Sequence, residues 1–93
     1  MLDVDRDPYV LSERVRRLVL TGGAGQEQIM NLFRPYWEEF FIRYAQQLTL
    51  TWEGYALVPY GAAYFSEWVM KNYPEIHDSV LSKLRRLESD HTV

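Results

Sequence analysis

The sequence predicts a mainly α-helical, compact single domain of four to five short helices spanning residues 1–93. Apolar residues recur at helical spacing through most of the chain. The length of 93 residues allows one hydrophobic core, because a core of half this size needs metals or disulfides to fold. The composition is 47% hydrophobic and 25% charged, with four prolines and five glycines, which is typical of a globular protein.

The first predicted helix begins at Asp7-Pro8, since an aspartate N-cap followed by proline at the first helical position is typical of a helix start. It ends at Thr21-Gly22-Gly23, because glycine is the preferred residue just beyond a helix C-terminus. A dinucleotide-binding loop is excluded there, since the third glycine of that motif falls on Gln28. The apolar face of this helix consists of Val10, Leu11, Val15, Leu18 and Val19.

The second stretch carries the strongest helical periodicity of the chain. Pro35 interrupts it, and proline removes a backbone hydrogen bond and crowds the preceding turn. We therefore expect either a kink or two helices, at about 26–33 and 35–47, with Pro35 opening the second. The residues that share the apolar face are Ile29, Met30, Phe33, Trp37, Phe40, Phe41, Tyr44 and Leu48.

The periodicity changes after Gln47. Apolar and polar residues alternate from Leu48 to Trp52, Glu53-Gly54 is typical of a turn, and a second apolar run ends at Pro59. This pattern is equally compatible with a short β-hairpin over about 48–59 and with an irregular connection.

Two more helices are expected after this connection. The first runs from about Gly61 to Lys71. The second begins in Asn72-Tyr73-Pro74-Glu75, which combines an N-cap candidate, a proline in the first turn and a glutamate at the capping-box position. The ends of the chain, 1–6 and 89–93, are expected to be flexible. The side chains expected to be buried are Tyr64, Phe65, Trp68 and Val69 in the first of these helices and Ile76, Val80, Leu81, Leu84 and Leu87 in the second.

Residue types that carry catalysis and metal binding are scarce. The chain has no cysteine and two histidines, so it has no thiolate nucleophile and no cysteine-based metal site. We expect His77 to be a partly exposed structural histidine. Glu39 and Arg43 lie four residues apart on a predicted helix and are interpreted as a surface ion pair, as are Arg34 and Glu38. We therefore expect a protein that is not an enzyme and needs neither cofactor nor metal.

Two basic clusters support one alternative, a nucleic-acid-associated regulator. Both lie near predicted helix C-termini, where the helix dipole favours cations without any partner. Because the net charge is −3, we expect nucleic acid not to be the partner unless the two helices lie side by side and join the clusters into one patch. The clusters are Arg14, Arg16 and Arg17 in the first helix and Lys83, Arg85 and Arg86 in the last.

Aromatic residues are the class in excess, at 15% of the chain. Tyrosine and tryptophan combine a large contact area with a polar tip and are enriched in protein interfaces. We therefore expect a protein–protein interaction module, an adaptor, inhibitor or assembly subunit, that binds another protein or a second copy of itself. The expected contact residues are Trp52, Tyr55, Tyr60 and Tyr64, in and beside the connection where the helical period breaks.

The N-terminal residues do not resemble a signal peptide, and no apolar run reaches the roughly 18 residues of a membrane span. We therefore expect a cytoplasmic protein that does not enter a membrane.

Overall fold

The computed structural model describes residues 6–45 and 50–90, and most of these residues are helical. The predicted mainly α-helical fold is therefore confirmed. In chain order the elements are α1 (Pro8–Thr21), α2 (Ala24–Met30), the 3₁₀ turn η2 (Arg34–Tyr36), α3 (Trp37–Phe40), the π-helical turn η3 (Phe41–Ala45), the π-helical turn η5 (Trp52–Ala56), α4 (Pro59–Asn72), the 3₁₀ turn η6 (Pro74–Ile76) and α5 (His77–Asp90).

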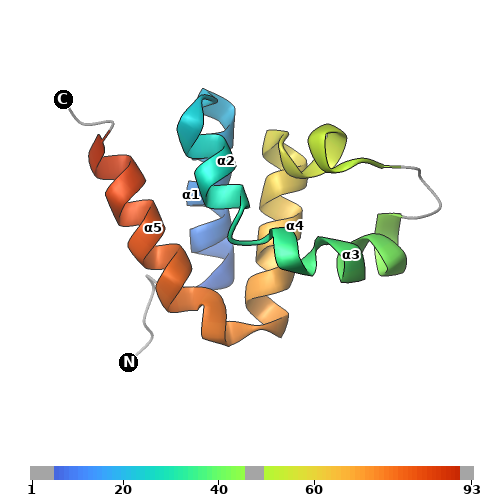
Figure 1. Cartoon of the computed structure of the whole chain (residues 1–93). Helices are drawn as coiled ribbons and strands as arrows, with labels where there is room; N and C mark the ends of the chain where they lie inside the picture. Colours follow the sequence, from blue (N-terminus) through green and yellow to red (C-terminus); the bar gives the residue numbers. More distant parts are fainter. Residues whose placement is uncertain (1–5, 46–49, 91–93) are drawn as a thin grey trace.

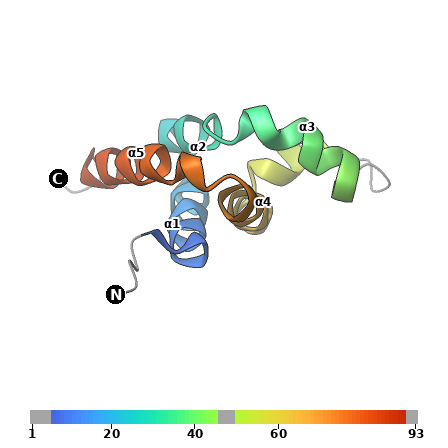
Figure 2. The ribbon, with the colours of Figure 1, turned by 90° about the horizontal axis from the view of Figure 1, so that it is seen from below.

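The helices form two layers, with α1 and α4 antiparallel in one and α5, α2 and α3 in the other (Figures 1 and 2). The molecule measures 41 × 33 × 18 Å. Its smallest dimension matches two layers of helices whose axes pack about 8–10 Å apart. The closest pairing of long helices is between α1 and α4. Within the described residues no helix is long and apolar enough to cross a membrane.

Helix α1 begins and ends where the sequence predicts. The Asp7 side chain accepts hydrogen bonds from the backbone N–H groups of Tyr9 and Val10, at 2.8 and 3.2 Å, and Pro8 occupies the first turn. Gly22 and Gly23 have φ angles of 74° and 79°, in the left-handed region that favours glycine. These two glycines turn the chain sharply into α2.

The core has an aliphatic half and an aromatic half. The aliphatic half lies between α1, α2 and α5. Every residue expected on the apolar face of the last helix is buried. The aromatic half lies between α3, η5 and α4. The buried aliphatic residues of α1, α2 and α5 are Leu11, Val15, Leu18, Val19, Ile29, Met30, Val80, Leu81, Leu84 and Leu87, and the buried rings are Phe33, Phe40, Trp52 and Phe65.

The segment around Pro35 confirms the expected break but not a regular second helix. Helix α2 stops at Met30, and the chain then passes through a 3₁₀ turn, one α-turn and a π-turn. Because a π-turn holds more residues than an α-turn, it rotates the residues after Phe41 away from the predicted seam. Tyr44, expected to face the core, is 49% exposed as a result. Leu48 lies outside the described residues.

The β-hairpin expected over about 48–59 is not formed by the part of this segment that the structure describes. The Thr51 hydroxyl accepts a hydrogen bond from the Gly54 N–H at 2.9 Å and caps the helical turn η5. Trp52 and Ala56, four residues apart, are both buried by this turn. Pro59 then occupies the first turn of α4 instead of ending a strand. Residues 48 and 49 lie outside the described residues.

The junction of α4 and α5 differs from the sequence expectation in its cap. Asn72 belongs to α4, and its side-chain amide donates to the Trp68 carbonyl at 2.8 Å, so it does not cap the following helix. Proline still opens that helix, through the turn η6. At the other end, α5 continues through residues 89 and 90, which were expected to be flexible. Of the other residues assigned to flexible ends, 1–5 and 91–93 lie outside the described residues.

Candidate functional site

The outer side of α4 carries an aromatic ridge. Tyr60, Tyr64 and Trp68 follow one another at intervals of four residues and therefore lie on the same side of the helix. Tyr60 is 83% exposed, Tyr64 is 58% exposed and Trp68 is half-buried. The opposite side of α4 is buried against α1 and the aromatic core through Ala62, Phe65, Ser66, Val69 and Met70. The packing of α4 thus leaves these rings facing outward.

Two residues from other elements extend this ridge. The ring centroid of Tyr44, in η3, lies 6.0 Å from that of Trp68 in an edge-to-face arrangement. Tyr55, in η5, is half-buried, and its pKa is raised by burial and then by the neighbouring Tyr64 hydroxyl. We call the surface formed by Tyr44, Tyr55, Tyr60, Tyr64 and Trp68 the aromatic face.

Buried rings support the aromatic face from below. Phe40 lies 5.2 Å from Tyr44, 5.7 Å from Tyr55 and 6.0 Å from Tyr64, measured between ring centroids. It also contacts Phe65 at 5.0 Å. Because interiors are close-packed and Phe40 is 1% exposed, these contacts restrict how the surface rings move. Tyr44, Tyr55 and Tyr64 are therefore restrained by Phe40 before any partner arrives.

The charges beside the aromatic face are paired with one another. Lys71 Nζ lies 2.7 Å from the Glu67 carboxylate, and this ion pair is the main reason why the pKa of Lys71 is raised. Arg43 lies 3.6 Å from Glu39 as the sequence predicts, and Glu39 also accepts a hydrogen bond from the Tyr73 hydroxyl. A small hollow of about 110 Å³ lies between Tyr64, Glu67, Trp68 and Lys71. The surroundings of the aromatic face thus combine rings with ion pairs.

The structure brings three of the four expected contact residues together: Tyr55, Tyr60 and Tyr64. Tyr64 was also expected to be among the buried residues of its helix, and its exposure shows that this expectation was wrong. The prediction that Trp52 is an exposed contact residue is wrong, since Trp52 is 7% exposed and packs edge-to-face against Trp37 and Phe65. Its place in the connection where the helical period breaks suggested exposure, whereas the helical turn η5 buries its ring.

Tyr44 and Trp68 were not predicted from the sequence to belong to this surface. The spacing of Tyr60, Tyr64 and Trp68 by four residues was visible in the sequence. However, helical periodicity alone does not tell which side of a helix faces solvent when both sides are apolar. The exposure of Tyr44 could not be predicted from the helical periodicity, because Tyr44 lies in the π-helical turn η3.

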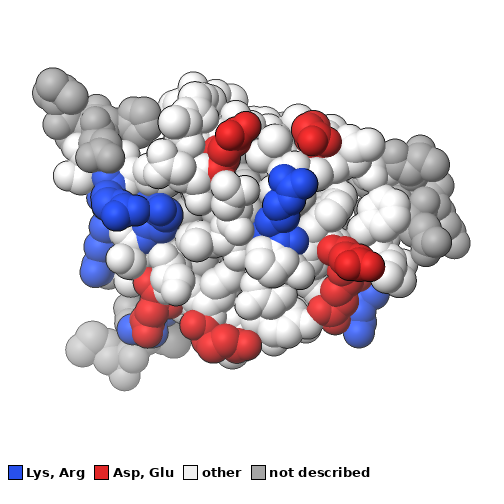
Figure 3. Space-filling view, viewed as in Figure 1, with Lys and Arg blue, Asp and Glu red and all other residues white. Residues whose placement is uncertain are grey.

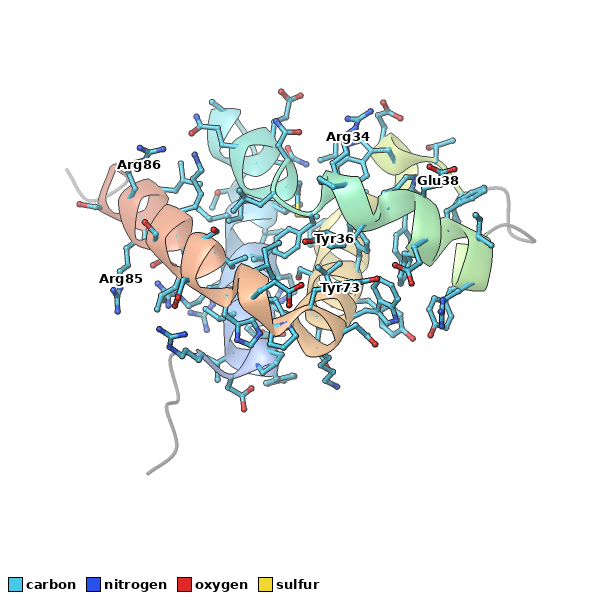
Figure 4. The ribbon with its side chains drawn as sticks, turned by 60° about the horizontal axis from the view of Figure 1, so that its bottom comes forward. Arg34, Tyr36, Glu38, Tyr73, Arg85 and Arg86 are labelled. Atoms are coloured by element: carbon cyan, nitrogen blue, oxygen red, sulfur yellow. The ribbon has the colours of Figure 1, made fainter. Side chains whose placement is uncertain are left out.

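The two basic clusters lie on the adjacent helices α1 and α5, with carboxylates among them. Arg14 of α1 donates to the Glu88 carboxylate of α5 at 3.0 and 2.5 Å, and Arg16 pairs with Glu13 at 3.3 Å. Lys and Arg side chains gather over α5 in Figure 3, next to acidic ones. Arg85 and Arg86 extend from opposite sides of α5 (Figure 4). Carboxylates therefore interrupt the positive field of these helices.

Two hollows adjoin these cations. One, of about 430 Å³, is lined by Asp78, Ser79, Ser82, Lys83 and Arg86, and another, of about 220 Å³, is lined by Arg14, Arg17, Leu18, Thr21 and Glu88. Each contains an acidic side chain among its basic ones. An approaching phosphate would therefore meet repulsion as well as attraction in both.

His77 has a structural contact. Its Nε2 lies 2.9 Å from the Met70 carbonyl, so the imidazole links the start of α5 to the last turn of α4. Among the residues that the structure describes, no three His, Asp or Glu side chains gather in a way that could hold a metal ion. Comparisons with protein-family models, curated proteins and solved structures give no match to this chain.

Proposed function

We propose that this protein is a non-catalytic protein–protein interaction module that binds its partner through the aromatic face. The observation that carries the proposal is the exposure of Tyr60 and Tyr64 on one side of α4, with Tyr44 and Tyr64 both packed against the buried Phe40. Scattered exposed apolar residues are common on monomeric proteins, whereas neighbouring exposed aromatics mark interaction surfaces. Binding would act by occlusion or scaffolding, without any change of covalent bonds.

The size of the aromatic face suits the centre of an interface. The exposed parts of Tyr44, Tyr60 and Tyr64 amount to roughly 400 Å², taking about 200 Å² for each tyrosine. A typical interface covers about 800 Å² on each partner, with aromatic residues at its centre and polar residues at its rim. The ion pairs Glu67–Lys71 and Glu39–Arg43 would supply part of that rim.

The chemistry of the aromatic face defines the partner surface. Tyrosine rings need apolar area to cover them, and their hydroxyl groups need hydrogen-bond acceptors at its edge. Because Phe40 restrains Tyr44, Tyr55 and Tyr64, these side chains lose less conformational entropy on binding than mobile ones would. A second copy of this chain is one such partner, and sedimentation at tens of micromolar distinguishes a homodimer from binding to another protein.

The test is photo-crosslinking in native cells from position 60 of the full chain, with position 83 on α5 as the matched control. Position 60 is expected to give a discrete protein adduct that position 83 does not. The purified adduct partner should then bind the Tyr60→Ser/Tyr64→Ser double variant at least about tenfold more weakly, and the Lys83→Ser/Arg86→Ser variant normally.

The proposal fails if positions 60 and 83 give the same adducts or if the tyrosine variant keeps full affinity. The nucleic-acid alternative gains support from one specific result. That result is binding to DNA or RNA at physiological salt that weakens steeply as salt is raised and is lost in the Lys83→Ser/Arg86→Ser variant.

A further inference from the structure

A polar pocket of about 170 Å³ lies between α2 and η5, outside the aromatic face. Figure 4 shows Arg34 extending between these two elements. Segments far apart in the sequence build the pocket, and the Gln26 side-chain amide donates to the Leu57 carbonyl to tie them together. The lining residues are Glu27, Asn31, Arg34, Trp52, Glu53 and Leu57.

The guanidinium in this pocket is held in a defined position. The Cζ atom of Arg34 lies 4.9 Å from the centre of the Trp52 ring, within the range of a cation–π interaction. Trp52 is itself wedged between Trp37 and Phe65, with ring centroids 5.5 and 6.0 Å away. Arg34 is exposed and lines the pocket, so its guanidinium N–H groups can donate to an anion there.

Two carboxylates, opposite in charge to Arg34, line the same pocket. Glu27 and Glu53 are exposed at its edge, and Asn31 can both donate and accept. Within residues 6–45 and 50–90, no ion pair joins Arg34 to either glutamate or to another acidic side chain. The pocket thus presents positive and negative charge that the described residues do not neutralise by contact.

We propose that this pocket binds a small zwitterion of the α-amino acid class. The carboxylate of the guest would accept hydrogen bonds from Arg34, and its ammonium group would lie between Glu27 and Glu53. A simple anion would be repelled by the two glutamates and a simple cation by Arg34. A guest that carries both charges, separated by one carbon, matches both kinds of group.

The volume sets the size of the guest. Water occupies about 30 Å³ per molecule, so the pocket has the volume of roughly six water molecules. Bonded atoms lie closer together than separate water molecules, so alanine, with six non-hydrogen atoms, fits within this volume. The guest is therefore a free amino acid with a short side chain that would lie against Leu57, rather than a drug-sized molecule, which needs about 300 Å³ or more.

The test is nuclear magnetic resonance of the full chain during titration with L-alanine. The indole N–H signal of Trp52, assigned with Trp52→Phe, and the side-chain N–H signals of Arg34 should shift in a saturable manner. N-acetyl-L-alanine has no ammonium and L-alaninamide has no carboxylate. Each should bind at least about tenfold more weakly than L-alanine, because each loses one charge-assisted contact.

Variants locate the binding. Arg34→Gln and the Glu27→Gln/Glu53→Gln double variant should each weaken binding by about tenfold or more, and the nearby Glu38→Gln variant should not. Arg34→Lys keeps the charge without the planar fork and should fall between wild type and Arg34→Gln. Thermal unfolding of each variant shows whether the fold is retained.

Three results overturn the proposal. The first is the lack of a saturable shift up to about 10 mM L-alanine, an affinity weaker than roughly 3 kcal/mol. The second is equal binding of N-acetyl-L-alanine, which would indicate a site for a peptide C-terminus instead. The third is unchanged binding in a folded Arg34→Gln protein. None of these results touches the protein–protein proposal, because the pocket shares no residue with the aromatic face.

Discussion

Aliphatic side chains fill the half of the core between α1, α2 and α5, whereas rings fill the half between α3, η5 and α4. The aliphatic half is built from helices of regular geometry, two of them 14 residues long. The aromatic half uses a 14-residue helix, α4, together with short 3₁₀ and π-helical turns. The chain thus buries aliphatic side chains with regular helices and rings with a helix and short turns.

The difference follows from the shapes of the side chains. Branched aliphatic residues interdigitate along a helix with little demand on orientation, so a regular helix buries them well. Rings prefer edge-to-face and offset arrangements, such as the 87° angle between Trp37 and Phe65. The backbone of the aromatic half adapts to place these rings, and some of them remain at the surface. The regular half therefore contains the amphipathic helices α1 and α5, and the irregular half carries the aromatic face.

The contact at Gly61 is the most sensitive point of the aromatic half. A Cβ atom at this position would lie 2.0 Å from the Tyr55 backbone oxygen, so α4 and η5 must move apart in a Gly61→Ala variant. We expect a loss of about 3 kcal/mol in the free energy of unfolding, at the upper end for overpacking, because backbone atoms yield less than a side chain. Unfolding by denaturant measures this loss of stability.

The neighbouring exposed position provides the control for that contact. Tyr60→Ala, one residue earlier on the outer side of α4, should change stability by less than about 0.5 kcal/mol. Equal losses in the two variants would show that the outer ridge, and not the close approach of α4 to η5, holds this region together.

A pair of substitutions tests whether the two core halves differ in tolerance. Phe65 and Leu84 are both fully buried, the first among rings and the second among aliphatic residues. Phe65→Leu should cost about 2 kcal/mol, because it removes ring contacts as well as volume. Leu84→Met keeps its volume and should cost less than about 1.5 kcal/mol. A Leu84→Met loss as large as that of Phe65→Leu, in the same unfolding experiment, would contradict the comparison.

The link between α1 and α5 is electrostatic as well as apolar. Arg14 makes a bidentate pair with Glu88, whose side chain is 40% exposed, so solvent screens part of the attraction. A double-mutant cycle with Arg14→Gln and Glu88→Gln should give a coupling energy of roughly 0.5–1 kcal/mol that shrinks with added salt. A coupling that salt does not change would assign the contact to packing.

The smallest effect concerns pH and the contact of Tyr73 with Glu39. The hydrogen bond to Glu39, with burial and the nearby carboxylate charge, raises the pKa of Tyr73 in the folded protein. The unfolded value is about 10, so this stabilisation is complete below pH of about 10 and is lost as pH rises through the folded pKa. We expect Tyr73→Phe to flatten the alkaline fall of stability, and Tyr55, whose pKa burial also raises, to account for part of what remains.

Unfolding measured from about pH 8 to pH 11 checks this expectation. Glu39→Gln serves as the matched variant, because it removes the charge that Tyr73 contacts and leaves the phenol in place. If the free energy of unfolding falls with the same slope in wild type and in Tyr73→Phe as pH rises, the contact is not a source of pH dependence.

Much of the fold could be predicted because its determinants are local. Asp7, Pro8 and the glycines at 22 and 23 set the limits of α1 through neighbouring backbone groups, whatever packs on the helix. The apolar face of α5 was likewise predicted in full, since a strongly amphipathic helix has one side to bury. Tyr55, Tyr60 and Tyr64 were also selected as contact residues from the sequence, although the reason given for them, an exposed connection, applied only in part.

The tertiary structure decided what local preferences leave open. The alternation around Trp52 left open a hairpin and an irregular connection, whereas the structure has the helical turn η5, in which the Trp52 ring packs against Trp37 and Phe65. Helix α4 has rings on more than one side, and its packing against α1 determines that Phe65 lies inside and Tyr64 outside. By itself, then, the sequence determined the limits of α1 and the buried face of α5, because those features depend on near neighbours. The exposed ridge and the Arg34 pocket depend on contacts between distant segments, and only the assembled chain brings those segments together.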